Sequence, residues 1–264
     1  MEKVNVNKVQ KSKVKGQKLA MLTAYDFPFA KILDEAGVDI VLVGDSLGNV
    51  ALGYRNTLPV TMEEMLVHTR AVSRAVKRAM VVADMPFGSF QESDEKAVAN
   101  AVKLVKAGAE AVKIEGAGYI SAIKKIIKAG IPVMGHVGFT PQSVNILGYR
   151  VQGRGKGEEG KIMKDAKALE KAGCFSIVLE LIPEKLAGKI TRALKVPTIG
   201  IGAGKKVDGQ VLVTNDLLGL YDSPPSFVKP RANLRKIVLK AVTEFISAEG
   251  GGVPVAQMDR AMDS

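Results

Sequence analysis

The sequence predicts an α/β protein whose fold is a single (β/α)₈ TIM barrel. The chain has 264 residues, and one barrel commonly takes about 250. Short apolar runs alternate with longer amphipathic stretches almost from end to end, as parallel strands joined by helices do. The first apolar run is followed by AYDFP at 24–28. That sequence is not the glycine-rich turn typical of an open nucleotide-binding sheet, so the barrel is favoured.

The expected strands are short apolar runs, and eight of them occur in the chain. Because longer crossovers separate most of them, we expect the strands to run parallel and to be buried on both faces. After the glycine run that ends at Gly204, only Lys205–Gly209 separates the last two, so the seventh crossover is the weakest part of the prediction. In chain order the strands are Lys18–Ala24, Ile40–Asp45, Met80–Asp84, Ala111–Glu115, Val133–Val137, Ser176–Leu181, Thr198–Ile201 and Gln210–Thr214.

The expected helices have apolar residues at helical spacing. They cover Pro28–Ala36, Met62–Ala79, Glu95–Ala107, Ile120–Ala129, Gly160–Ala172, Glu184–Leu194 and Leu234–Ala248. Thr61 and Glu64 have the spacing of a capping box, which predicts a helix start at Met62. A glycine can take the left-handed conformation that ends a helix. Such glycines precede four strands, in the pairs Ala36-Gly37, Ala107-Gly108, Ala129-Gly130 and Ala172-Gly173.

Residues 1–248 are expected to form one catalytic barrel domain, followed by a disordered tail at 249–264 that begins with EGGG. The charged stretch Gly153–Gly160 follows the fifth strand and is interpreted either as a solvated linker or as a mobile lid. The first 18 residues lack the apolar run of a signal peptide. No later run approaches the roughly 20 apolar residues of a membrane helix. We therefore expect a soluble, cytoplasmic protein with no membrane partner.

The chain is basic, with 38 Lys and Arg against 27 Asp and Glu and a formal net charge of +11. Such a charge suits nucleic acid, a membrane surface or an anionic substrate. Aromatic residues make up only 5% and Trp is absent, so bases would find few side chains to stack on. We expect no nucleic-acid partner. Cys174 is the one cysteine, which excludes an intramolecular disulfide and a zinc site built from cysteines.

Polar side chains recur at the carboxyl ends of five consecutive expected strands, where barrel enzymes place their active sites. Any one of these residues alone would be interpreted as a surface acid. A buried carboxylate without a partner is costly, so stability does not explain the whole set, and we interpret it as a functional site. Its members are Asp45, Ser46, Asp84, Lys113, Glu115, His136 and Glu180.

Asp45, Asp84 and Glu115 come from three neighbouring strands, and three converging carboxylates repel one another unless a cation lies between them. Oxygen ligands suit Mg²⁺. Zinc is less suitable, because the chain has no His-Cys cluster and no HExxH motif. The alternative is that one of these acids is protonated or forms an ion pair with Lys113.

Lys113 and Glu115 are two residues apart on one strand, so both are expected to face the barrel interior. Lys113 could hold a carboxylate, form a Schiff base or neutralise Glu115. His136 could act as an acid, a base or a donor, or could simply be hydrogen-bonded. Glu180 lies in an apolar run, which is expected to raise the pKa of its carboxyl toward the range of a general base. The run GIGAG at 200–204 is either a phosphate-binding loop or a tight turn.

Seven motifs, in this order, resemble the ketopantoate hydroxymethyltransferase family over roughly residues 3–248. They are MLTAYD at 21–26, GDSLG at 44–48, ADMPFG at 83–88, VKIEG at 112–116, GHVGFTPQS at 135–143, TIGIGAG at 198–204 and DGQVL at 208–212. The resemblance implies a cytoplasmic, Mg²⁺-dependent barrel enzyme of pantothenate biosynthesis. It would transfer a hydroxymethyl group from 5,10-methylenetetrahydrofolate to 3-methyl-2-oxobutanoate, giving 2-dehydropantoate. Members are typically large homo-oligomers, often decamers.

The resemblance also implies roles by motif position. Glu180 would be the general base, and His136 would orient groups near the metal. The residues at the metal would be Asp45 and Asp84, with Glu115 close by and partly bridged through water. The residues that hold the oxoacid would be Asp45, Ser46, Asp84 and Lys113, and His136 is counted with them as a substrate-binding residue. The sequence departs from the family at Asn215-Asp216, where the family has His-Asp, and in the tail after Glu249.

Two other enzyme classes remain open. One is a Mg²⁺-dependent 2-oxoacid lyase or mutase of the phosphoenolpyruvate mutase and isocitrate lyase type. Those enzymes generally carry a cysteine in a catalytic loop, whereas Cys174 stands at the start of an expected strand. The other class is an aldolase that forms an imine through Lys113.

Overall fold

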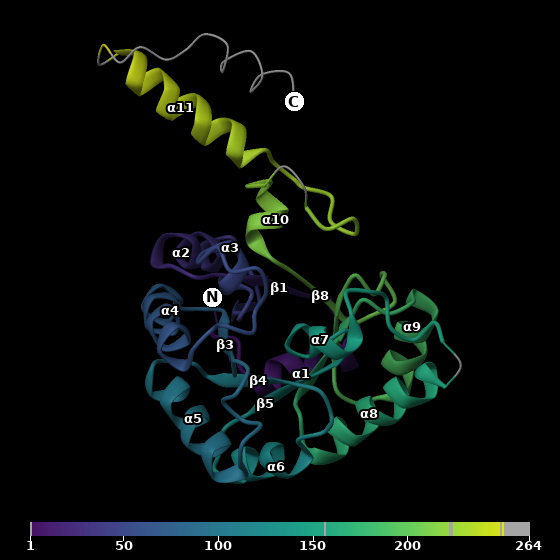
Figure 1. Cartoon of the computed structure of the whole chain (residues 1–264). Helices are drawn as coiled ribbons and strands as arrows, with labels where there is room; N and C mark the ends of the chain where they lie inside the picture. Colours follow the sequence, from purple (N-terminus) through teal and green to yellow (C-terminus); the bar gives the residue numbers. More distant parts are fainter. Residues whose placement is uncertain (1, 156, 222–223, 249, 251–264) are drawn as a thin grey trace. The chain divides into compact units, whose positions relative to one another are not determined.

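Eight parallel strands close into a barrel in the computed structural model, which describes residues 2–155, 157–221, 224–248 and 250 (Figure 1). The strands are β1 (Leu19–Thr23), β2 (Ile40–Val43), β3 (Met80–Asp84), β4 (Ala111–Glu115), β5 (Val133–Gly138), β6 (Ser176–Glu180), β7 (Thr198–Ile201) and β8 (Gly209–Leu212). They follow one another around the barrel in chain order. The predicted (β/α)₈ barrel is confirmed, and each strand end lies within two residues of the expected one.

The chain divides into two compact units, Met1–Val211 and Leu212–Ser264. In the first unit, Figure 1 shows helices surrounding the strands of the barrel. Its helices are α1 (Val6–Val14), α2 (Phe27–Glu35), α3 (Leu47–Val50), α4 (Met62–Ala75), α5 (Asp94–Lys106), α6 (Ile120–Lys128), the 3₁₀ helix η1 (Pro141–Ser143), α7 (Val144–Leu147), α8 (Glu158–Ala172) and α9 (Glu184–Ala193).

The second unit contains α10 (Thr214–Leu218) and α11 (Leu234–Ala248). Helix α11 confirms the helix predicted at the same residues. The extent of the catalytic domain, 1–248, stays a prediction, and the expected tail at 249–264 lies outside the described residues except for Gly250. Among the helices of the described residues, none is both long enough and apolar enough to cross a membrane.

Alternate side chains of the strands enter two apolar clusters, as the two-residue period of a strand requires. One cluster fills the inside of the barrel, with Met21, Leu42 and Met134 among its members. The other lies between the strands and the helices around them. Val9 of α1 is fully buried in the inner cluster. Helix α1, which the sequence analysis missed, therefore closes one end of the barrel.

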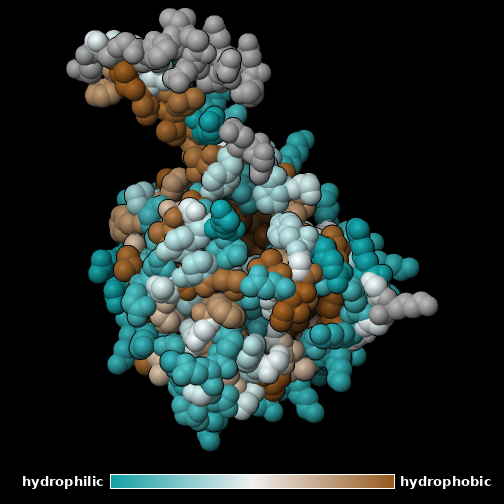
Figure 2. All heavy atoms as spheres, in the orientation of Figure 1, coloured by the Kyte–Doolittle hydropathy of each residue, from teal (hydrophilic) through white to brown (hydrophobic). Residues whose placement is uncertain are grey.

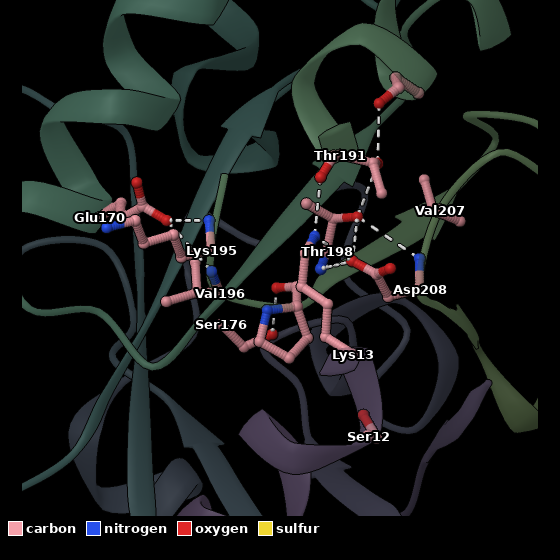
Figure 3. A network of polar contacts seen from close by, with 12 residues as sticks. Ser12, Lys13, Glu170, Ser176, Thr191, Lys195, Val196, Thr198, Val207 and Asp208 are labelled. Carbon is pink, nitrogen blue, oxygen red and sulfur yellow. Dashed lines mark hydrogen bonds and ion pairs between the residues drawn. The ribbon is translucent and has the colours of Figure 1, made fainter. Parts of the chain in front are cut away.

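A polar network holds α1 at the amino ends of the strands (Figure 3). Lys13 of α1 donates to Asp208 Oδ2 at 2.8 Å and to the Thr191 carbonyl oxygen of α9 at 2.7 Å. The same Asp208 oxygen accepts hydrogen bonds from the backbone N–H and the hydroxyl of Thr198, the first residue of β7, at 2.9 and 3.1 Å. Both charged side chains are only 16% exposed. The ion pair thus joins α1 to β7 and to the segment that enters β8.

The helix predicted to run to Ala79 ends four residues earlier, at Ala75. Its start is as predicted, because Thr61 and Glu64 form the expected capping box. Beyond its end, the Asp34 carboxylate accepts the backbone N–H groups of Lys77, Arg78 and Ala79. Burial raises the pKa of Asp34, but these three bonds outweigh burial and lower it below its usual value. The Asp34 carboxylate, which is distant in the sequence, thus binds N–H groups that would otherwise continue the helix. The chain leaves the helix there and enters β3.

The seventh crossover, residues 202–208, contains no helix. Gly204 has φ +75°, and a Cβ there would lie 2.4 Å from the Cβ of Glu184. The Glu184 carboxylate accepts the backbone N–H of Lys205 at 3.0 Å. The glycine run therefore packs as a tight turn against the start of α9, and this arrangement favours the tight turn over a phosphate-binding loop.

Candidate active site

Polar side chains from β2 to β6 converge inside the barrel at the carboxyl ends of the strands. The strand register places Asp84 beside Lys113 and Glu115 beside His136. Glu180, the last residue of β6, has a side chain that is 15% exposed. The remaining charged or ionisable members are 1–5% exposed: Asp45, Asp84, Lys113, Glu115 and His136. The structure thus brings together the residues that the sequence analysis grouped.

Lys113 lies between two carboxylates. Its Nζ is 2.8 Å from Asp84 Oδ1 and 3.8 Å from Glu115 Oε1. Burial opposes a charged amine, but the negative charges of Asp84, Glu115 and Asp45 outweigh burial and raise the pKa of Lys113 above its usual value. Lys113 is therefore a buried ammonium ion at neutral pH, paired with Asp84.

The ring of His136 also lies between two carboxylates. Its Nδ1 is 3.5 Å from Glu115 Oε1, and its Nε2 is 3.3 Å from Glu180 Oε2. Burial and the charge of Lys113 oppose protonation of the ring, but Glu115 and Glu180 outweigh them and raise the pKa of His136 to about 9. Burial likewise opposes the charged form of Glu115, yet His136 and Lys113 hold the pKa of that carboxyl below its usual value.

Asp45 directly follows β2 and packs against Asp84. The backbone N–H of Asp45 donates to Asp84 Oδ2 at 3.0 Å. Burial raises the pKa of both carboxyls, and the negative charges of Asp84 and Glu115 raise that of Asp45 further. The next residue, Ser46, is half-buried, and its Oγ lies 2.9 Å from the Tyr25 hydroxyl. The Ser46 hydroxyl therefore directly follows the Asp45 carboxylate in the chain, at the acidic part of the cluster.

The surroundings of Asp45 fit a divalent cation. Burial, and after it the negative charges of Asp84 and Glu115, raise the pKa of Asp45 despite the charge of Lys113. Oδ2 of Asp45 accepts one hydrogen bond, whereas Oδ1 has no protein partner among the described residues. Within the described ranges, no three His, Cys, Asp or Glu side chains form a ready-made metal site. Such a cation would be held by one or two carboxylates and by water and substrate, which is how Mg²⁺ is commonly bound.

Gln142 of η1 is a member of the cluster that the sequence analysis missed. It is 7% exposed. Its Nε2 donates to Asp45 Oδ2 at 2.8 Å and to the Met85 carbonyl oxygen at 2.9 Å, and its backbone N–H donates to Glu115 Oε2 at 2.9 Å. The sequence pattern singles out charged and ionisable side chains at strand ends, and the side chain of Gln142 is a neutral amide. The one available clue is its place in TPQS, directly after a strand that ends at the site.

The glycine-rich stretch at 153–160 begins as a turn around one carboxylate. Glu158, the first residue of α8, accepts the backbone N–H groups of Gly153, Arg154 and Gly155 at 2.8–3.1 Å. Arg150 donates to the same side chain at 3.0 Å. The Arg150 bond and the backbone bonds lower the pKa of Glu158 to about 2. Residues 153–155 are thereby tied to α8, and the choice between linker and lid stays open.

Apolar side chains are exposed on α7, which continues directly from η1. Ile146 of α7 is 89% exposed, and Tyr149, just beyond it, is 69% exposed. Figure 2 shows hydrophobic atoms gathered over α7. The Tyr149 ring packs edge-on against Phe139, with centroids 5.1 Å apart. The exposed side chains of Ile146 and Tyr149 lie only a few residues after Gln142 in the chain. Apolar side chains near a set of polar groups suit a ligand that has a flat apolar part.

The sequence profile of the ketopantoate hydroxymethyltransferase family matches residues 3–251. Curated relatives named 3-methyl-2-oxobutanoate hydroxymethyltransferase include one from Pyrococcus furiosus and one from Thermotoga maritima. The Pyrococcus protein is 54% identical over 93% of this chain and 87% of its own. The Thermotoga protein is 55% identical over 92% of this chain and 90% of its own.

Solved structures with the same fold include phosphonopyruvate hydrolase in complex with oxalate and Mg²⁺, with a TM-score of 0.64, 14% identity, and coverage of 98% of this chain and 95% of that one. A 2,3-dimethylmalate lyase, described as a phosphoenolpyruvate mutase/isocitrate lyase superfamily member, has a TM-score of 0.62 and 14% identity, and the match covers 97% of this chain and 94% of that one. At this identity the likeness shows the barrel fold and no more. The profile and the close relatives each span almost the whole chain, so the chain belongs to the ketopantoate hydroxymethyltransferase family.

Proposed function

We propose that this chain transfers a hydroxymethyl group from 5,10-methylenetetrahydrofolate to 3-methyl-2-oxobutanoate, forming 2-dehydropantoate for pantothenate biosynthesis. The observation that carries the proposal is the buried cluster at the carboxyl ends of β2 to β6, in a chain of this family. Overall, the oxoacid, the folate and water give 2-dehydropantoate and tetrahydrofolate. This balance requires a base for the C3 proton, groups that hold a 2-oxoacid, and a place for the folate.

The carboxylates Asp45 and Asp84 are the proposed holders of Mg²⁺, with Glu115 close by. Carboxylate oxygen is the donor that this ion prefers, and the repulsion of the buried Asp45 carboxylate by Asp84 and Glu115 supports the assignment. When bound, the ion would draw electron density from the carbonyl of the oxoacid and so acidify its C3 proton.

Lys113 and Ser46 are the proposed partners of the substrate carboxylate. The raised pKa of Lys113 keeps its amine protonated, and a protonated amine is no nucleophile. This favours an ionic role for Lys113 over the imine-forming aldolase. Asp84, 2.8 Å from the amine, fixes the side chain where an incoming carboxylate would meet it.

Glu180 is the proposed general base. Its side chain is more exposed than Glu115, so it can reach a substrate above the cluster. We propose that its carboxylate takes the C3 proton and that C3 then forms a bond to the one-carbon unit. The two carbon–nitrogen bonds of that unit to the folate break, water supplies its hydroxyl oxygen, and the folate nitrogens take up the protons. His136, 3.3 Å from Glu180 Oε2, would hold that carboxylate in place and take no part in bond formation. The exposed apolar residues Ile146 and Tyr149 are the proposed contact for the folate ring.

Hydrogen–deuterium exchange at C3 of 3-methyl-2-oxobutanoate tests this assignment without folate. In D₂O with Mg²⁺, we expect the wild-type chain to catalyse the exchange and Glu180→Gln to lose it. A wild-type chain that gives no exchange would exclude this function and leave the lyase or mutase class. The expected homo-oligomer, a decamer in many members of the family, and the cytoplasmic location stay predictions.

A further inference from the structure

We propose that Gln142 is a positioning residue that turns the Asp45 carboxylate so that one of its oxygens, Oδ1, is left for a cation and substrate. This inference rests on the proposed function. It concerns a residue for which neither the charge pattern nor the motif positions suggested a role.

The orientation of the Gln142 amide is fixed by its neighbours. Its Nε2 faces two acceptors, the Asp45 carboxylate at 2.8 Å and the Met85 carbonyl at 2.9 Å. Its Oε1 accepts from Gln91 Nε2 at 3.3 Å. The Gln91 Oε1 in turn accepts the backbone N–H of Gly88 at 2.8 Å. With the amide reversed, an oxygen would face two acceptors, so only one orientation satisfies every group.

Gln142 connects three strand ends that are distant in sequence. Asp45 follows β2, Met85 follows β3, and Glu115 ends β4. The residue reaches Asp45, 97 positions away, through its side chain, and Glu115 through its backbone N–H. One buried residue therefore determines how two of the proposed metal-site carboxylates face each other.

Protein groups lie against most of the carboxylate oxygens of Asp45, Asp84 and Glu115. Asp84 uses Oδ1 for Lys113 and Oδ2 for the Asp45 N–H. Glu115 uses Oε2 for Gln142, and its Oε1 lies near Lys113 and His136. Among the carboxylate oxygens of Asp45, Asp84 and Glu115, within the described part of the chain, Oδ1 of Asp45 is the one with neither a hydrogen bond nor an ion pair. Because Gln142 holds Oδ2, it decides which oxygen of Asp45 stays available.

The test compares Gln142→Met with a matched variant of another buried glutamine, Gln152→Met. Gln152 is 5% exposed, and its Nε2 donates to the Arg150 carbonyl. Within the described ranges its side chain forms no hydrogen bond to a carboxylate. Binding of Mn²⁺ alone is measured by electron paramagnetic resonance, and folding is checked by thermal unfolding. We expect the Kd for Mn²⁺ to rise about 10- to 100-fold in Gln142→Met, as for other residues that orient metal ligands. We expect it to stay within about twofold of wild type in Gln152→Met.

A second readout separates positioning from general damage. Raising the metal concentration is expected to restore most of the kcat of Gln142→Met, but none of that of Glu180→Gln. If Gln142→Met does not fold, Gln91→Met decides. It removes the donor to the Gln142 carbonyl and the acceptor of the Gly88 and Phe90 N–H groups but leaves Gln142 itself in place, and it is expected to raise the Kd about threefold.

A folded Gln142→Met with the wild-type Kd for Mn²⁺ would overturn the inference, and so would an unchanged Kd in Gln91→Met if that variant has to decide. Failure of the proposed function would be visible in the wild-type chain alone, as absence of both Mn²⁺ binding and C3 exchange. The two failures are therefore distinguishable.

Discussion

Lys113 Nζ lies 2.8 Å from Asp84 Oδ1, across two neighbouring strands whose register puts these residues side by side. The more distant partner, Glu115, is on the same strand as Lys113, and its Oε1 is 3.8 Å away. Residues two apart on a strand are separated by about 6.6 Å, whereas paired residues on adjacent strands are about 4.8 Å apart. Lys113 of β4 therefore pairs with Asp84 on the adjacent strand β3, although Glu115 is nearer to it along the chain.

Replacing Lys113 by Met removes the one cationic side chain of the described residues that forms an ion pair with Asp84. We expect kcat/KM for the oxoacid to fall by about 10²-fold, because the loss of one partner leaves buried charge unpaired. Steady-state kinetics at saturating folate measure the change. Borohydride trapping on the wild-type chain is the companion experiment. A reduced substrate adduct that forms in the presence of EDTA would contradict the ionic role of Lys113.

Replacing Glu180 by Gln removes the proposed base and keeps the size of the side chain. We expect kcat to fall by about 10²- to 10⁴-fold, with little change in the KM for the oxoacid, because general base catalysis typically contributes that much. Single-turnover kinetics resolve the chemical step. Equal activity of Glu180→Gln and wild type would show that another group takes the proton.

Replacing the exposed Ile146 by Asn tests the proposed folate contact. Burial of one large aliphatic side chain is worth about 1.5 kcal/mol or more, so we expect the KM for the folate to rise about tenfold. The KM for the oxoacid should stay the same. Val105→Asn, at a 38% exposed residue of α5, is the control and should change neither constant. A rise confined to the oxoacid would place the folate elsewhere.

Replacing Lys13 by Met breaks the ion pair at the opposite end of the barrel. We expect the free energy of unfolding to fall by about 2 kcal/mol, since Asp208 loses a charged donor while largely buried. Urea denaturation measures the loss, and kcat should not change. Lys8→Met is the matched control, because Lys8 is exposed and lies 3.9 Å from Glu2. If both variants lose the same stability, the network in Figure 3 does not hold α1.

The carboxylate of Glu158 makes a pH-dependent contribution to stability. Its pKa in the folded chain is lowered from 4.5 to about 2, so the charged form is favoured by folding. The contribution is fully present above pH 4.5 and is lost as the pH falls from 4.5 toward 2. Urea denaturation of wild type and Glu158→Gln should differ most at neutral pH and converge in acid. A difference that grows in acid would have the wrong sign.

The barrel and most of its site could be predicted, because both depend on local periodicity. A two-residue period sends Lys113 and Glu115 inward together, and parallel strands bring the acids that end them to one edge. The positions of Asp45, Asp84 and Glu180 follow from the same rule. None of this needs knowledge of which distant residues touch.

What could not be predicted depends on contacts between distant residues or on weak local signals. Gln142 is neutral, and its place in the cluster depends on a hydrogen bond that its side-chain amide donates to Asp45, 97 positions away. Helix α1 is rich in lysine and buries only Val9 and Ser12, so its apolar periodicity is faint. The early end of α4 depends on the Asp34 carboxylate, 43 positions before the Lys77 amide that it binds.

The most direct test of the central claim is a product assay, with 2-dehydropantoate detected by ¹³C NMR from labelled 5,10-methylenetetrahydrofolate. We expect the wild-type chain with Mg²⁺ and 3-methyl-2-oxobutanoate to place the label in the new hydroxymethyl carbon. Glu180→Gln and Asp84→Asn should form little or no product. Full activity of both variants would contradict the site assignment, and no labelled product from the wild-type chain would contradict the proposed reaction.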